Sequence, residues 1–547
     1  MTRRLLAVLL SVAFALPAAA EHQHNAKTAD SVPLFDNLGT HHHKISTKVP
    51  LAQRYFDQGL RLVYAFNHEE AVRAFKEAAR LDPNCAMAYW GVGLALGPNY
   101  NLPLDPERNR AAYAATQKAV KFAPKASAAE RAYIAALTKR YSLAPDADRK
   151  ALDQAYADAM REVAHAYPDD TDAATLFAES LMDLRPWALW TLDGQPQPGT
   201  LEIVATLEAV LKKDPMHPGA NHYYIHAIEA SPQPDRGLVA AERLHNLVPG
   251  AGHLVHMPSH IYMRTGRYAD AADANTQAIK VDEAYIAAVK PAGVYPMMYY
   301  PHNIHFFWAA ASMEGRSADA IRAAREVTNG VSPEMVKEMD AIEYFVPTAL
   351  FALARFGKWE EILHEPAPPA GQPYATGIWH YARGLALANT GRLDEAASEQ
   401  QAVAAAAAAM PPERIIGDNT PPAALLHLAA EALAGESAAR RGQTDDAVKH
   451  LQEAVRAQDA LPYTEPPPWY YPVRQSLGAV LLTAGRPADA EAVYRDDLQR
   501  NPENGWSLYG LWQALRARQA EAEAAAVEER FRKAWARADV ALTASRF

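Results

Sequence analysis

The chain has 547 residues, of which 49% are hydrophobic, and it carries a formal net charge of -10 at pH 7. An acidic balance without a long basic run excludes nucleic acid as a partner, because neutralising phosphates requires a cationic surface. Cys85 is the single cysteine, which excludes an internal disulfide and a cysteine-based metal site.

The first residues have the three-part form of a secretory signal. A short basic start precedes an apolar run from Leu5 to Leu16, and small residues follow at Ala18 and Ala20. The run is too short to span a membrane, and no later stretch reaches the ~18 to 20 unbroken apolar residues that a span requires. We therefore expect residues 1–20 to be a signal peptide and the mature chain to be periplasmic or secreted, without a transmembrane segment.

Residues 21–50 form a polar lead-in that contains the triplet His41, His42 and His43 and shows no helical periodicity. Two interpretations of this segment are open. It is either a flexible lead-in that packs over the first helices or a tail that recruits metal.

A helical pattern begins at Leu51. Its aromatic and small positions restart at Tyr89 and Gly93, which lie 34 residues after Tyr55 and Gly59. In such a pattern small residues let paired helices approach closely, aromatic residues fill the gaps between hairpins, and a proline ends the second helix. The stretch resembles the tetratricopeptide repeat (TPR) family at the hallmark positions Tyr55, Gly59, Ala71, Phe75, Ala78 and Pro83.

The resemblance implies an all-α fold over residues 51–547, a TPR-like right-handed superhelical solenoid of about ten helical hairpins. In that family the first helix of each hairpin lines the concave groove. Later segments such as FALARFGKWEEIL and ALANTGRLDEAASEQ place a glycine at the turn between two helices, as helix C-caps require.

Two insertions interrupt the helices, at residues 97–109 and 185–200. Loops inserted into a solenoid usually gather on one face, often the binding face. The second insertion contains Trp187 and Trp190, whose apolar area could equally pin the loop to the nearest hairpin. The sequence leaves open whether these loops cover a site or are pinned.

A histidine-rich stretch spans residues 221–305. His222 and His226 are four residues apart and share one helix face, and the same spacing recurs 34 residues later, which is the TPR repeat length. Glycines at the inter-helix turns, Gly266 and Gly315, set the helical phase. This phase predicts that seven histidines from three successive helices point into one groove: His222, His226, His253, His256, His260, His302 and His305.

Imidazoles on helices packed about 8 to 10 Å apart can reach a shared transition-metal ion. The seven histidines would serve two or three ions, since four ligands normally suffice for one zinc ion. Copper is favoured because Met257 and Met298 accompany the histidines, with iron or zinc as alternatives. Glu229 is the candidate to orient a ligand or act as a general base. Pro258, inside the cluster, predicts a kink in its helix.

Three functions are compatible with these features. The first is an exported metal-dependent protein with its site in the groove, either an oxidoreductase, favoured over a hydrolase, or a metal carrier. The second is a metal-free TPR scaffold that binds a peptide or protein partner in the groove, and the third is a small-molecule binder that uses aromatic rings as stacking platforms. No organic cofactor is expected, and the family resemblance transfers no catalytic residue because its motif is structural.

Overall fold

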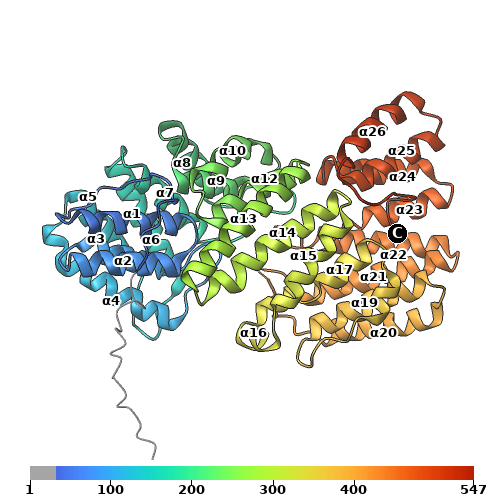
Figure 1. The fold of residues 1–547 in the computed structure, drawn as a ribbon, viewed down its shortest axis with the longest axis horizontal. Coiled ribbons are helices and arrows are strands. Elements are labelled where there is room, and N and C mark those ends of the chain that lie inside the picture. Colours follow the sequence, from blue (N-terminus) through green and yellow to red (C-terminus); the bar gives the residue numbers. More distant parts are fainter. Residues whose placement is uncertain (1–31, 418) are drawn as a thin grey trace, which may run out of the picture. The chain divides into compact units, whose positions relative to one another are not determined.

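The fold is a succession of helical hairpins in which consecutive helices pack side by side (Figure 1). The computed structural model describes residues 32–547 except residue 418. Phe35–Phe547 form one compact unit, whereas residues 32–34 belong to the other unit and contain no helix or strand. The described residues contain isolated bridges but no strand. These observations confirm the predicted all-α, TPR-like solenoid; the predicted signal peptide, residues 1–20, and residues 21–31 lie outside the described residues.

The first half of the unit contains all but one of the helices that carry the histidines of the candidate site. Most are joined in sequence as contacting pairs. Their bounds are α1 Pro50–Tyr64, α2 His68–Leu81, α3 Ala86–Ala95, α4 Pro106–Phe122, α5 Ala128–Leu137, α6 Arg149–Ala166, α7 Thr171–Met182, α8 Thr200–Lys213, α9 Pro218–Ile228, α10 Leu238–Leu247, α11 Gly252–His256, α12 Pro258–Arg264 and α13 Tyr268–Val289, with short 3-10 turns η1 Ala123–Lys125 and η2 Pro234–Gly237.

The second half continues the succession of helical hairpins after a π-helical turn, η3 Tyr295–Tyr299. A short helix and a 3-10 segment, α16 Pro333–Glu338 and η4 Asp340–Phe345, are inserted before the hairpins resume. The remaining helices are α14 Tyr300–Met313, α15 Ser317–Gly330, α17 Thr348–Arg355, α18 Trp359–His364, α19 Pro373–Asn389, α20 Leu393–Ala409, α21 Pro422–Arg440, α22 Thr444–Asp459, α23 Arg474–Thr483, α24 Pro487–Arg500, α25 Gly505–Ala517 and α26 Glu521–Ala534.

The inter-helix turns explain where the helices of the site end. Gly266, between α12 and α13, has φ of 75°, and Gly315, between α14 and α15, has φ of 71°. A residue without a Cβ adopts this left-handed conformation at little cost. The predicted glycine turns that set the helical phase are therefore confirmed at both positions.

At the start of the array, one aromatic ring, that of Phe75, fills the space between α1, α2 and α3. Phe75 of α2 is fully buried, and its ring lies 5.4 Å from that of Phe56. A Cβ at Gly59 of α1 would come within 2.6 Å of the Phe75 ring, and one at Gly91 of α3 would overlap it. Glycines on both sides thus make room for the ring, which is the role that the repeat pattern assigns to its small residues.

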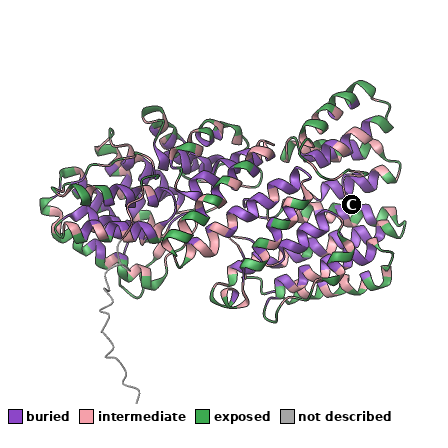
Figure 2. Ribbon diagram, in the orientation of Figure 1, coloured by how far each residue is buried: buried purple, intermediate pink, exposed green. Residues whose placement is uncertain are grey.

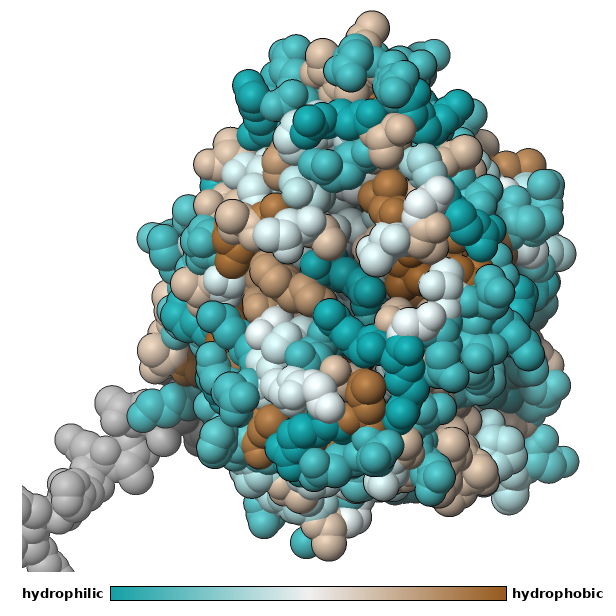
Figure 3. All heavy atoms as spheres, turned by 90° about the vertical axis from the view of Figure 1, so that its right-hand side faces the viewer, coloured by the Kyte–Doolittle hydropathy of each residue, from teal (hydrophilic) through white to brown (hydrophobic). Residues whose placement is uncertain are grey.

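Buried residues line the inner faces of the hairpins and exposed residues their outer faces (Figure 2). The face in Figure 3 is mostly hydrophilic, and its apolar residues occur in small groups. Among the described residues, no helix is both long enough and apolar enough to cross a membrane.

The helix carrying the second histidine pair is broken, as predicted, at its proline. α11 ends at His256 and α12 begins at Pro258, whose ring nitrogen cannot donate the hydrogen bond that would continue the helix. The two histidines of this pair therefore lie on separate short helices.

We predict that Gly91→Ala destabilises the protein by about 1 to 3 kcal/mol, because the added methyl group overpacks the Phe75 ring. The measurement is the free energy of unfolding in denaturant. Gly330→Ala is the matched control: Gly330 is exposed at the end of α15, and a methyl group added there would have no neighbour within 4 Å. Equal effects of the two substitutions would contradict the packing argument.

Candidate metal centre

Six histidines from four helices converge in the interior. They form two groups of three, triad A (His222, His226 and His253) and triad B (His256, His260 and His302), and within each group the candidate ligand atoms lie within 4.8 Å of one another. α9 carries the first pair, α11 and α12 the next three histidines, and α14 carries His302. Five of the six are at most 2% exposed, and His302 is partly buried.

The tautomers of triad A follow from its hydrogen bonds. His222 Nδ1 lies 2.7 Å from the backbone carbonyl oxygen of Tyr64, and His226 Nδ1 lies 2.9 Å from Glu229 Oε1. A carbonyl or carboxylate oxygen only accepts, so both Nδ1 atoms carry the proton. In the neutral form of each ring the Nε2 atom then carries the lone pair, and His226 Nε2 has no hydrogen-bond partner among the described residues.

Triad B is oriented in the same way. His260 Nδ1 donates to Glu229 Oε2 at 2.5 Å, and His256 Nδ1 donates to Asn275 Oδ1 at 2.7 Å. The Asn275 amide nitrogen donates to the Ala271 carbonyl at 2.8 Å, which leaves its oxygen facing His256. Both rings again direct unprotonated Nε2 atoms inward.

The converging nitrogens lie at distances suited to a shared ion. His256 Nε2 is 2.8 Å from His260 Nε2 and 3.2 Å from His302 Nε2, and the His222 and His253 Nε2 atoms are 3.1 Å apart. Ligand nitrogens of a tetrahedral site with bonds of about 2.0 to 2.1 Å are roughly 3.3 Å apart. The His256 and His260 lone pairs face each other without a proton between them, an arrangement that a cation would stabilise.

The surroundings keep the imidazoles neutral. Phe66 packs against triad A, with its ring 4.5 Å from that of His222, and Phe306 packs against triad B, 4.8 Å from His256. Burial, followed by the neighbouring histidines, lowers the pKa values of His222, His253, His256 and His302 well below 6.5. Neutral imidazole is the form that binds a metal ion.

Glu229 links the two triads. Its carboxylate accepts from a histidine of each triad and is 1% exposed. Burial opposes ionisation of this group, whereas the hydrogen bonds donated by His226 and His260 favour the ionised carboxylate. Of the two roles expected for Glu229, this geometry fits the orientation of ligands, a role that carboxylates commonly take behind metal-bound histidine.

His305 is placed differently from the other six predicted ligands. Its ring lies 4.7 Å from Trp308, 5.4 Å from Tyr344 and 5.3 Å from Phe345, and it belongs to neither triad. Burial lowers its pKa to about 3. The pairing within the cluster also differs from the simple repeat offset, because His222 approaches His253 rather than His256.

A cavity of about 390 Å³ adjoins both triads and is lined by His226, His253, His260 and His302. Both predicted insertions contribute to its wall, the first through Asn101, Leu102 and Pro103 and the second through Trp187. Trp190 instead donates its Nε1–H to the Ala227 carbonyl at 2.7 Å. Trp190 thus holds the second loop against α9, while Trp187 forms part of the cavity wall.

Several buried polar atoms of the cavity wall have no hydrogen-bond partner among the described residues. They are Asn101 Oδ1, Trp187 Nε1, His226 Nε2, His253 Nδ1, His305 Nδ1, Thr420 Oγ1 and Glu465 Oε2. An unsatisfied buried polar group costs on the order of 1 to 3 kcal/mol. Their gathering around one cavity is typical of a ligand-binding site.

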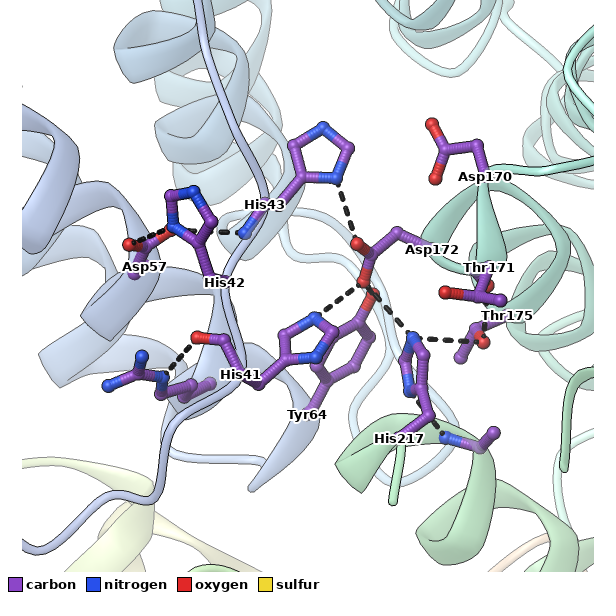
Figure 4. Close-up of polar contacts among 12 residues, drawn as sticks. His41, His42, His43, Asp57, Tyr64, Asp170, Thr171, Asp172, Thr175 and His217 are labelled. Carbon is purple, nitrogen blue, oxygen red and sulfur yellow. Dashed lines mark hydrogen bonds and ion pairs between the residues drawn. The ribbon is translucent and has the colours of Figure 1, made fainter. Parts of the chain in front are cut away.

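A second histidine cluster surrounds Asp172 of α7 (Figure 4). Asp172 Oδ1 accepts from Tyr64 Oη at 2.5 Å, His41 Nε2 at 2.9 Å and His217 Nε2 at 3.1 Å, and Oδ2 accepts from His43 Nδ1 at 2.8 Å. These bonds hold the extended segment 35–49, which we call the strap, against α1 and α7. They favour the packing interpretation of the described part of the lead-in.

The tautomer of His217 distinguishes this cluster from the two triads. His217 Nδ1 accepts the backbone N–H of Ala220 at 3.1 Å as the N-cap of α9, so its proton is on Nε2 and is donated to Asp172. With four donors, both oxygens of the carboxylate are hydrogen-bonded. The cluster around Asp172 is therefore a satisfied structural network, whereas the triads direct lone pairs at one another.

No family model and no curated protein matches the sequence. Similar solved structures include human IFIT1 as a dimer with m7Gppp-AAAA, at 13% identity and a TM-score of 0.32, covering 90% of this chain and 91% of that one.

Two further solved structures are the P58(IPK) TPR domain and yeast Tom70. The first has 11% identity, a TM-score of 0.21 and coverage of 86% of this chain and 99% of that one. The second has 11% identity, a TM-score of 0.27 and coverage of 88% and 90%. Likeness at these TM-scores carries no conclusion about ligands or partners.

The sequence did not indicate several residues that orient the site. The Tyr64 carbonyl and Asn275 hold His222 and His256, yet a backbone oxygen leaves no trace in sequence and an asparagine in α13 is unremarkable. Asp172 and His217 lie 45 residues apart and meet through tertiary packing. For the histidine-rich strap, the sequence left open a packed lead-in or a tail that recruits metal, and it did not indicate the partner Asp172.

We predict that His43 stabilises the fold in a pH-dependent way. Burial lowers its pKa, but the hydrogen bond and charge of Asp172, with Asp170 and Asp57, outweigh this and raise the pKa to about 9. Because the pKa is raised on folding, the stabilisation is complete below the unfolded value of about 6.5 and is lost as pH rises through 9.

The free energy of unfolding should therefore fall by up to about 3 kcal/mol between pH 6.5 and 9.5, relative to His43→Gln measured in parallel. His42→Gln is the control, since the His42 side chain is 54% exposed. Identical pH profiles of the wild-type and His43→Gln proteins would show that His43 is not protonated in the folded state.

Proposed function

We propose that this protein binds two transition-metal ions, one in each histidine triad, and acts as a metal-dependent oxidoreductase on an organic substrate held in the adjoining cavity. The observation that carries the proposal is the orientation of His222, His226, His256 and His260. Each ring has its Nδ1–H engaged by a fixed acceptor. The lone pairs on Nε2 are thereby directed to common points.

Three imidazoles per ion leave a coordination position open, the arrangement found in catalytic rather than structural metal sites. His226, His253, His260 and His302 line the cavity, so the open positions would face it. The proposed substrate would lie beside the metal ions without displacing any of the six histidines.

Copper is the metal that we favour. Imidazole suits copper, zinc and iron, but divalent copper binds nitrogen donors most strongly in the first-row series. Met298 in the cavity wall adds a soft sulfur atom near the triads. Bound copper would supply one-electron redox chemistry, while the chain's own residues hold the imidazoles neutral and orient them.

Burial favours an oxidoreductase over a metal carrier. A carrier must release its ion to a partner, yet five of the six histidines are at most 2% exposed. The cavity, in contrast, is lined by four of the six histidines, so a small molecule held there would lie beside both triads. We also propose that the protein is exported, on the basis of residues 1–20; a mature chain beginning near Glu21 in N-terminal sequencing would support this.

We predict that purified protein, reconstituted with copper and dialysed, retains roughly two equivalents of metal, one per triad. His226→Ala and His256→Ala should each lower the retained copper to about one equivalent or less, because each removes one of three ligands from a triad. The measurement is elemental analysis of untagged protein by mass spectrometry.

His305→Leu is the matched control, since His305 is equally buried but belongs to neither triad. Its copper content should equal that of the wild type. Less than about a tenth of an equivalent of any transition metal after reconstitution would overturn the proposal. The TPR-like array would then be better interpreted as a metal-free scaffold for a peptide or protein partner.

A further inference from the structure

The residues that line the cavity beside the triads indicate which class of molecule it would bind. Aromatic rings of Trp187, Tyr299, Tyr344 and Phe345 line it together with the Met298 and Met339 side chains. Flat apolar surfaces of this kind favour a planar, unsaturated ligand. A volume of about 390 Å³ suits a compound of one or two rings.

The polar atoms of the wall indicate what substituents the ligand carries. Thr420 is 1% exposed and Glu465 is 3% exposed, and Thr420 Oγ1 and Glu465 Oε2 lack hydrogen-bond partners among the described residues. Trp187 Nε1–H and Asn101 Oδ1 add an unpaired donor and an unpaired acceptor. A ligand bearing hydroxyl groups satisfies donors and acceptors alike.

The chain places no cationic side chain in the cavity wall, since the lining residues include no lysine or arginine. In the metal-free protein an anionic ligand would therefore be buried without a counter-charge, which is costly. Glu465 accepts from Tyr463 Oη through its other oxygen. Burial, with the charge of Glu229, raises the Glu465 pKa to about 8, so its carboxyl is largely protonated at pH 7 and attracts cations only weakly.

We propose that the cavity binds a neutral hydroxylated aromatic compound of the phenol or catechol class, with its ring between the aromatic side chains and its hydroxyl groups on Thr420 and Glu465. This inference extends the proposed function by naming its substrate class. Thr420 and Glu465 lie in the loops that precede α21 and α23, far along the chain from the histidine-rich stretch. They select the ligand and are not metal ligands.

The test is calorimetric titration of metal-free wild-type protein with catechol, benzene and benzoate. Chelator-treated protein is used so that catechol cannot bind through a metal ion. We expect catechol to bind saturably with one equivalent, at least about tenfold more tightly than benzene or benzoate, because only catechol pairs the polar atoms of the wall without bringing a charge.

Thr420→Val and Glu465→Gln should each weaken catechol binding about fivefold or more, because a hydrogen-bonding group is removed or changed, and leave benzene binding unaltered. Thr420→Val is nearly isosteric and removes a hydroxyl that has no partner among the described residues, so it should fold. Thr483→Val, at a threonine bonded to the Ala479 carbonyl and outside the cavity wall, is the matched control.

The absence of saturable catechol binding, equal affinities for catechol and benzene, or unchanged catechol binding in both variants would overturn the inference. Each outcome is independent of metal content because the titrations contain none. Catechol binding by a protein that takes up no copper would preserve the ligand assignment and remove the redox function. Copper uptake without catechol binding would preserve the proposed metal sites and remove the ligand assignment.

Discussion

The candidate site depends on hydrogen bonds that fix the protons of four buried imidazoles. Nδ1–H groups donate to the Tyr64 carbonyl, the Glu229 carboxylate and the Asn275 amide oxygen, and each bond leaves the opposite nitrogen unprotonated. Because the rings are buried and burial lowers the pKa values of His222, His256 and His260, protonating that nitrogen would bury a charge. Convergent lone pairs are unfavourable without a cation and favourable with one. The proposed chemistry rests on this contrast.

The cluster around Asp172 shows that buried histidines alone do not indicate a metal site. There the same residue type donates N–H groups to one carboxylate, and the network is complete as it stands. Tyr64 belongs to both arrangements, since its hydroxyl donates to Asp172 and its carbonyl accepts from His222. The strap is thereby joined to triad A through one residue, so the structural network helps to hold a proposed ligand in place.

The repeat pattern is sufficient to predict much of this arrangement. The spacing of His222 and His226, its recurrence 34 residues later and the glycine turns together predict that histidines of successive helices meet, and six of the seven do. His305 differs because it faces η4, an inserted segment whose Tyr344 and Phe345 enclose its ring. The break at Pro258 is also predictable, since proline cannot continue a helix hydrogen bond.

Other parts of the site depend on contacts between distant segments that no local pattern encodes. Residues 97–109 and Trp187 are recognisable as insertions, but their position over the triads follows from tertiary packing, as does the approach of Thr420 and Glu465. The strap allows two interpretations from sequence because its partners, Asp57 and Asp172, lie on different helices. A sequence pattern places residues on a helix face; it does not place one loop against another.

The most direct measurement of the central claim is anomalous X-ray diffraction at the copper edge from crystals of the copper-reconstituted protein. The account predicts two peaks, each about 2.0 to 2.1 Å from the Nε2 atoms of one triad. Strong peaks elsewhere on the protein, with none within bonding distance of His222, His226, His253, His256, His260 or His302, would contradict it.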